Sequence, residues 1–128
     1  MEKECKNVKE NVGLLDMTAF AKCRIKGPKA EEFLDKLVAN KLPKKIGRIN
    51  LCHALNTKGG VHSEFTIMRE SENSFYLVSA GAFQRLDHDW IYKWMPKDGS
   101  VQFENLSNSI GVLLSLIHIL TLPTNREV

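Results

Sequence analysis

One segment in the middle of the chain constrains the fold most, because it has the pattern of two strands joined by a tight turn. Residues 49–56 and 61–69 are rich in apolar and β-branched side chains. The intervening Thr57-Lys58-Gly59-Gly60 supplies residues that favour a turn. The sequence therefore predicts an antiparallel hairpin.

The register of this hairpin follows from counting outward from the turn. If Asn56 pairs with Val61, then His53 lies opposite Glu64. One face of the hairpin then carries small or apolar side chains, as a face beneath helices should: Cys52, Ala54, Val61, Phe65 and Ile67.

The opposite face of the hairpin mixes apolar and ionisable side chains: Leu51, His53, Leu55, His62, Glu64, Thr66 and Met68. An acid among apolar neighbours is typical of a small-molecule pocket, which has apolar walls and a few placed polar groups. Partial burial there would raise the pKa of Glu64 towards a value useful for proton transfer. The alternative is an exposed cross-strand pair of Glu64 and His53, worth about 0.2–1 kcal/mol.

The flanking segments predict an α+β fold. Residues 21–26 alternate as a strand, and Gly27-Pro28 starts a helix whose apolar stripe runs to a stop at Asn40 and Pro43. Further patterns predict a polar helix or connector at residues 1–12 and strands at 12–16, 74–80 and 101–106, with a helix at 82–95. This order predicts a mainly antiparallel sheet with two helices packed on it.

Composition excludes several classes of function. The net charge of +3 is small and its basic residues are scattered among 15 acids, so no nucleic-acid partner is predicted. The longest apolar run, residues 112–122, is too short to cross a bilayer, and no secretory signal opens the chain. Three cysteines without a CxxC motif indicate free thiols, and together these features predict a cytoplasmic protein.

Several segments resemble the aminomethyltransferase family, the T-protein of the glycine cleavage system. Residues 55–67, LNTKGGVHSEFTI, are similar to the family's "LN..GG...(D/E)(L/F)TV" segment. Residues 13–22 are similar to its opening "GL.D.S...K" strand, and residues 25–34 to its "V.G.DA..FL" corner. The Asp87-His88-Asp89-Trp90 helix is similar to the branch fused to dimethylglycine or sarcosine dehydrogenases. The resemblance runs from about residue 8 to residue 114.

This resemblance implies that residues 1–114 are the N-terminal, ferredoxin-like half of a T-protein folate-binding domain. Such domains move a one-carbon unit from an amine carrier to tetrahydrofolate. The family's acidic hairpin residue falls on Glu64, where stand-alone T-proteins usually carry Asp. The residues assigned to cofactor binding are Phe20, Leu51, His53, Thr66, Met68 and Ser79. Leu51 replaces a tyrosine of the family and Ser79 an asparagine, so the hydrogen bonds of those side chains do not carry over.

The same resemblance implies that the chain is a fragment and inactive alone. The family's pocket closes against a second half with another acid and an arginine. No GxGxxG motif is present, so FAD would belong to an upstream flavin domain that oxidises the N-methyl amine. Residues 115–128 depart from the family pattern and are expected to be a non-native tail that packs poorly. An inactive folate-binding or relic module is the alternative function.

Three other candidate sites have simpler interpretations. A metal site from His53, His62 and Glu64 is not expected, because no HxH or CxxC spacing holds two ligands rigidly and nearby Cys52 should point to the other face. On that core face Cys52 is not expected to be a nucleophile either, since a buried structural thiol is inert. The basic loop of residues 41–48 is interpreted as a solvated connector. The second interpretation is that it binds the polyglutamate tail of a folate, and the third is that it binds nucleic acid. Trp90 and Trp94 fall on a helical stripe that predicts core packing.

Overall fold

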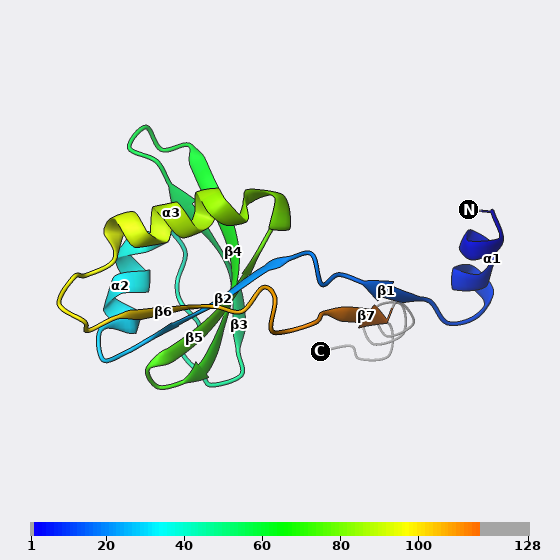
Figure 1. Cartoon of the computed structure of the whole chain (residues 1–128), viewed down its shortest axis with the longest axis horizontal. Helices are drawn as coiled ribbons and strands as arrows, with labels where there is room; N and C mark the ends of the chain where they lie inside the picture. The colour runs from blue at the N-terminus through cyan, green and yellow to red at the C-terminus, as the bar shows by residue number, and fades with distance from the viewer. Residues whose placement is uncertain (1, 116–128) are drawn as a thin grey trace. The chain divides into compact units, whose positions relative to one another are not determined.

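A computed structural model describes residues 2–115 of the chain (Figure 1). The described residues divide into two compact units, one made of residues 20–110 and the other of residues 2–19 with 111–115. Apart from Ser115, the tail predicted at residues 115–128 lies outside the described residues.

The smaller unit contains a helix and a two-stranded ribbon. Helix α1 (Glu2–Glu10) agrees with the short helix predicted for the polar N-terminus. Strands β1 (Leu14–Asp16) and β7 (Leu113–Ser115) pair antiparallel. The ribbon continues by one bond, in which the Met17 amide donates to the Val112 carbonyl at 2.8 Å.

The larger unit is built on a five-stranded sheet in the order β3-β4-β5-β2-β6. All its neighbouring strands are antiparallel. The strands are β2 (Ala21–Lys26), β3 (Ile49–Leu55), β4 (Val61–Ser71), β5 (Ser74–Ser79) and β6 (Gln102–Asn105). Helix α2 (Ala30–Leu37) follows β2, and the short η1 (Gly81–Phe83) leads into α3 (Gln84–Trp94). The predicted α+β fold, a mainly antiparallel sheet with two helices, is therefore confirmed.

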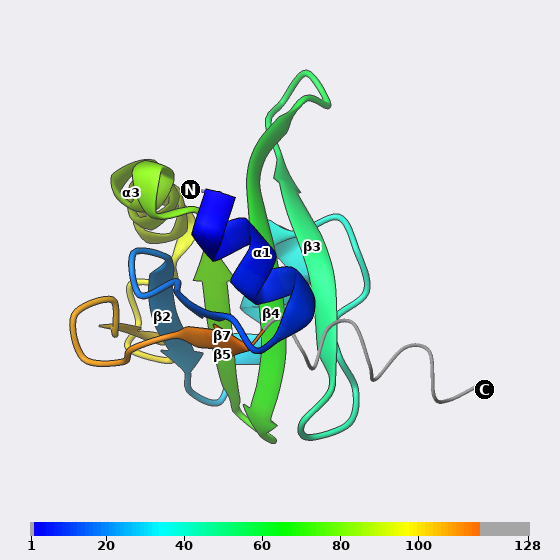
Figure 2. The same cartoon turned by 90° about the vertical axis from the view of Figure 1, so that its right-hand side faces the viewer.

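Both α2 and α3 cover the same face of this sheet (Figures 1 and 2). The alternation predicted at residues 21–26 is confirmed, since Cys23 and Ile25 point into the core. One hydrophobic cluster joins the strands to the helices: Cys23, Ile25, Cys52, Ala54, Phe65, Ile67, Phe75 and Leu77 from the sheet, and Phe33, Leu34, Leu37 and Ile91 from the helices.

Helix α2 ends earlier than its sequence pattern suggests, at Leu37 rather than near Asn40. The chain after it bonds to β3 instead of continuing the helix. The Ala39 amide donates to the His53 carbonyl at 2.8 Å, and the Asn40 side-chain amide donates to the Leu51 carbonyl at 2.6 Å. These bonds fix the edge strand that carries the candidate site.

Arg69 anchors the basic loop that follows α2. Its side chain is buried, and its guanidinium donates to the Pro43 carbonyl at 2.7 Å and the Glu72 carbonyl at 2.9 Å. It also pairs with Glu31 at 2.5 Å and lies 4.6 Å from the centroid of the Phe75 ring. One buried cation therefore joins the loop, the β4–β5 turn and α2.

Candidate functional site

The hairpin register predicted from the sequence is largely confirmed. His53 pairs with Glu64. The register shifts between Ala54 and Leu55, so Val61 pairs with Leu55 rather than with Asn56. Val61 is 64% exposed, which corrects its expected place on the core face. The irregularity beside the turn turns Val61 away from that face.

Strand β4 is longer than its neighbour β5, and this difference creates a pocket. Thr66 pairs with Val78 near the end of β5, so the part of β4 before Thr66 runs on beyond it. Figures 1 and 2 show the hairpin turn projecting past the rest of the sheet. A cavity of about 390 Å³ lies between this projecting arm and the start of α3. Its lining residues are Phe20, Val61, His62, Ser63, Glu64, Thr66, Val78, Ser79, Ala80, Phe83 and Asp87.

Glu64 lines this pocket but is more exposed than expected. Its side chain is 60% exposed, and its Oε2 lies 2.8 Å from Nε2 of His53. The expected partial burial is therefore wrong, because both helices of the larger unit cover the opposite face of the sheet. The cross-strand pair with His53, which the sequence left as an alternative, is present.

Three of the other predicted site residues line the same pocket as Glu64: Phe20, Thr66 and Ser79. His53 reaches the site through its bond to Glu64 rather than through the lining. Leu51 and Met68 do not line it. Leu51 is 49% exposed opposite Thr66, and Met68 lies further along β4 between Ile49 and Tyr76.

The structure adds a second carboxylate that was not among the predicted site residues. Asp87, in the first turn of α3, is only 3% exposed and lines the pocket. A signal was available, because Asp87 lies four residues after Phe83 and four before the buried Ile91. That spacing puts an acid on the buried stripe of the helix.

Contacts across the pocket join the hairpin to α3. The His62 ring stacks on Trp90, with 3.9 Å between ring centroids. Nδ1 of His62 also lies 2.7 Å from the hydroxyl oxygen of the buried Ser63. The stack on Trp90 holds the arm that carries Glu64 beside the helix that carries Asp87.

The cysteines are free, and the two buried ones are poorly suited to nucleophilic chemistry. Burial first, and the negative charge of Asp87 second, raise the pKa of Cys23 to about 12. Burial likewise raises the pKa of Cys52. Cys52 is fully buried on the core face, which confirms the face predicted for it.

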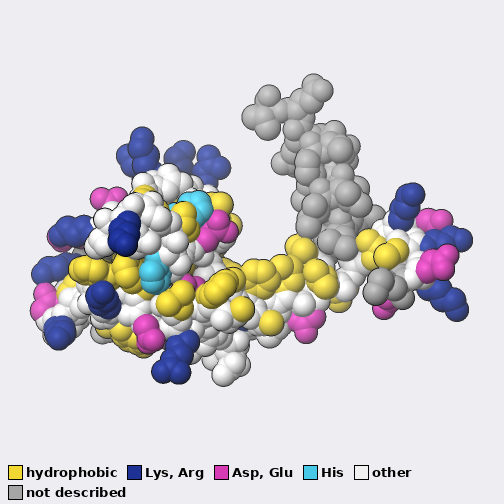
Figure 3. All heavy atoms as spheres, turned by 90° about the horizontal axis from the view of Figure 1, so that it is seen from above, with side chains coloured by type: hydrophobic (Ala, Val, Ile, Leu, Met, Phe, Trp, Pro, Cys, Tyr) yellow, Lys and Arg dark blue, Asp and Glu magenta, His cyan; other side chains and the backbone are white. Residues whose placement is uncertain are grey.

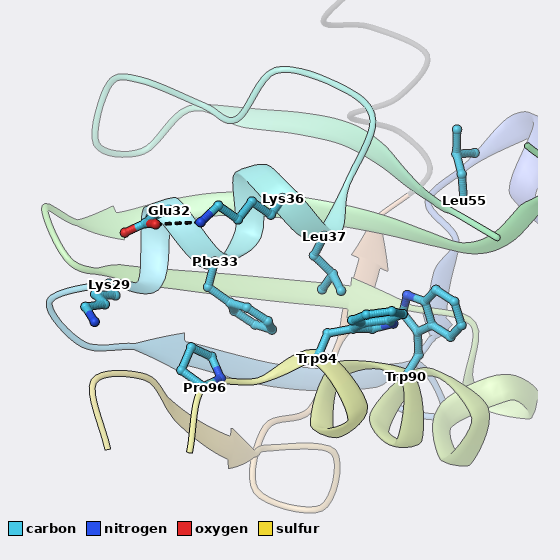
Figure 4. A pocket seen from close by; sticks show the side chains of 9 residues that line it. All are labelled: Lys29, Glu32, Phe33, Lys36, Leu37, Leu55, Trp90, Trp94 and Pro96. Carbon is cyan, nitrogen blue, oxygen red and sulfur yellow. Dashed lines mark hydrogen bonds and ion pairs between the residues drawn. The ribbon is translucent and has the colours of Figure 1, made fainter. Parts of the chain in front are cut away.

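A second hollow lies between α2 and α3 (Figure 4). It has a volume of about 500 Å³, and Phe33, Leu37, Trp90 and Trp94 contribute to its walls. Trp94 is 51% exposed, so its predicted core position is wrong. Ile91 fills the core at this end of α3 and leaves Trp94 over the gap between the helices.

Within residues 2–115, no group of three or more His, Cys, Asp or Glu side chains is arranged to hold a metal ion. No helix in that range is long and apolar enough to span a bilayer.

Figure 3 shows the basic side chains of the larger unit spread over the visible face, with acids among them. The lysines of the loop at residues 41–48 line a shallow hollow of about 430 Å³.

Comparison with known proteins identifies relatives along most of the chain. The model of the GCVT N-terminal domain matches residues 1–115. Dimethylglycine dehydrogenase of Rattus norvegicus, a mitochondrial protein, is 34% identical over 111 residues, which cover 86% of this chain and 13% of the relative. The aminomethyltransferase of Porphyromonas gingivalis is 30% identical over 108 residues, covering 84% of this chain and 29% of the relative.

A solved structure agrees with these sequence matches. The glycine cleavage system aminomethyltransferase T of Bartonella henselae superposes with a TM-score of 0.72 and 25% identity. The match covers 82% of this chain and 29% of that protein. The chain thus spans less than a third of each of these three relatives.

Proposed function

Because the chain belongs to the GCVT N-terminal domain family, we propose that it is the tetrahydrofolate-binding part of a domain that transfers a one-carbon unit from an amine to folate. One observation carries the proposal. The pocket at the hairpin tip brings Glu64 together with Phe20, Thr66 and Ser79, which the family resemblance assigns to the folate site. Its volume of about 390 Å³ is within the range of small-molecule sites.

Glu64 is the proposed catalytic residue. A folate nitrogen that attacks a one-carbon unit becomes cationic and must lose a proton. An accessible carboxylate at the pocket wall can orient that nitrogen, accept its proton and stabilise its positive charge. His53, 2.8 Å from Oε2 of Glu64, would hold the carboxylate in one orientation.

The complete protein is proposed to resemble the dehydrogenase-fused branch of the family. There an upstream flavin domain with FAD would oxidise an N-methyl amine, and the second half of the folate domain would close the pocket. Residues 1–114 are the proposed family part and residues 115–128 a non-native tail. The three free thiols are compatible with a reducing compartment, and we propose that this compartment is the cytoplasm.

A binding module without turnover is the second candidate. It is favoured by Leu51 and Ser79, which stand where the resemblance places a hydrogen-bonding tyrosine and asparagine. The exposure of Glu64 also fits a site that binds without accelerating proton transfer.

Isothermal titration of the 128-residue chain with tetrahydrofolate tests the binding half of the proposal. Saturable heat is expected, and its absence at millimolar folate would overturn folate binding.

In the complete protein, Glu64→Gln should lower the rate of methylenetetrahydrofolate formation by roughly 10²-fold or more, because a general base is lost. Glu72→Gln, at an exposed acid of the β4–β5 turn, is the matched control. An unchanged rate in Glu64→Gln would remove the catalytic role from Glu64, whereas a complete wild-type protein that binds folate but forms no methylenetetrahydrofolate would favour the second candidate.

A further inference from the structure

The pocket contains a buried carboxylate that the proposed role of Glu64 does not use. Asp87 is 3% exposed. Within residues 2–115, no group hydrogen-bonds or forms an ion pair with its carboxylate. Within residues 2–115, the completely buried side-chain atoms without a hydrogen-bond partner are His88 Nε2 and Trp90 Nε1, so the carboxylate of Asp87 keeps contact with the solvent of the pocket that it lines. A mostly buried acid that has no protein partner and is open to a cavity is available to a ligand of opposite charge.

The lining of the pocket indicates the charge of that ligand. It includes two carboxylates, Glu64 and Asp87, and no lysine or arginine. The side chains of the lining therefore favour a positive group over an anion. The buried Lys22 does not line the pocket, and its ammonium donates to the Phe20 carbonyl at 2.8 Å. The aromatic side chains of the pocket, Phe20 and Phe83, lie in the same lining. Aromatic rings attract organic cations, above all alkylated ammonium groups.

We propose that the pocket binds the cationic nitrogen of an alkylated amine, with Asp87 as its counter-ion. The identity of this cation as the amine that carries the one-carbon unit rests on the proposed function. Glu64, on the exposed arm of the hairpin, would then face the folate nitrogen. Asp87, on α3, would hold the donor from the opposite wall.

In this arrangement Asp87 forms and breaks no covalent bond. It is a positioning residue that keeps the positively charged donor beside the attacking nitrogen and compensates its charge. The ordinary alternative is that Asp87 only interacts with the N-terminal end of α3, as acids in a first helical turn often do. The two explanations differ in whether the pocket distinguishes a cation from a neutral molecule of the same shape.

Choline and 3,3-dimethylbutan-1-ol are matched probes, because they have the same shape and differ in charge. Amide chemical shifts of the 128-residue chain, followed by NMR during titration, measure both affinities and locate the binding. We expect the wild-type chain to prefer choline by about tenfold, the ratio that about 1.4 kcal/mol produces. The shifts should concentrate at Ser63, Ser79 and Asp87.

Asp87→Asn should reduce the preference to about twofold or less, since it removes the charge and nearly preserves the shape. Asp89→Asn is the matched control, because Asp89 lies on the same helix with its side chain 72% exposed. That variant should keep the wild-type preference. Equal loss in both variants would overturn the role of Asp87.

The wild-type measurement decides the proposal even if Asp87→Asn does not fold. Equal affinities for choline and its neutral isostere would overturn the cation site. Tetrahydrofolate titration is a separate measurement. Folate binding without cation preference would overturn this inference alone, and cation preference without folate binding would overturn the proposed function while supporting a cation site.

Discussion

The His62 ring from β4 stacks on the Trp90 indole from α3, with 3.9 Å between centroids and 26° between planes. Glu64 lies two residues beyond His62 on the same strand, and Asp87 lies three residues before Trp90 on the same helix. The stack therefore connects the two walls that carry the carboxylates of the pocket. Whatever loosens it should change both stability and the width of the site.

Replacing His62 tests this connection. His62→Ala removes the stack and should lower the free energy of unfolding by about 0.5–1.5 kcal/mol, the usual contribution of an aromatic pair. His62→Phe keeps a flat ring and should retain most of that stability. Urea denaturation followed by tryptophan fluorescence measures both variants. Equal losses for alanine and phenylalanine would show that the ring contact contributes nothing.

The hairpin register could be predicted because local rules determine it. A short turn and a face of small and apolar residues leave few registers possible, and His53 does pair with Glu64. The alternation at residues 21–26 similarly fixed the core side of β2, where Cys23 and Ile25 are buried. These features depend on residues close together in sequence.

The extent of the pocket could not be predicted in the same way. Alternation assigns Leu51 and Met68 to the face of Glu64, but it does not say where β5 ends or where α3 begins. Those non-local features confine the pocket to the tip of the hairpin and bring Asp87 into it. The exposure of Glu64 likewise depends on which face the helices cover, which periodicity alone leaves open.

Acid should weaken the larger unit through Glu70. Arg24 donates to both carboxylate oxygens of Glu70, from Nε at 2.6 Å and from Nη2 at 2.9 Å. Ser74 donates a further bond at 2.9 Å. The bonds from Arg24 first, and from Ser74 to a lesser degree, hold the pKa of Glu70 below its ordinary value of 4.5.

The sign of the effect follows from proton binding. Between the lowered pKa and the ordinary value of 4.5, the unfolded chain binds more protons than the folded one at this site. The stabilisation is therefore complete above that window and is lost as pH falls through it. Because the pair is partly solvated, the loss should be at most about 1 kcal/mol.

Urea denaturation measures this loss of stability when it is repeated at several pH values between about pH 6 and about pH 3, the range in which carboxylates titrate. Glu70→Gln should be less stable at pH 6 and should show a flatter acid decline. Glu72→Gln, whose exposed side chain forms no hydrogen bond within residues 2–115, should follow the wild-type profile. A Glu70→Gln profile as steep as that of the wild type would contradict the assignment.

The corner between β2 and α2 should tolerate no side chain at Gly27. Its φ of +133° is rarely adopted by other residues, and an added Cβ would collide with the carbonyl oxygen of Ser100. Gly47 also has a positive φ, of +81°, but nothing lies within 4 Å of a Cβ there. Gly27→Ala should therefore lower the free energy of unfolding by about 3 kcal/mol or more, and Gly47→Ala by about 1 kcal/mol. Urea denaturation of both variants compares Gly27→Ala, which suffers the collision and the larger backbone strain, with Gly47→Ala, whose φ lies near the left-handed helical region and whose Cβ meets nothing. Losses of equal size would mean that the Ser100 segment moves aside, and that the close approach of the two backbones does not determine where α2 begins.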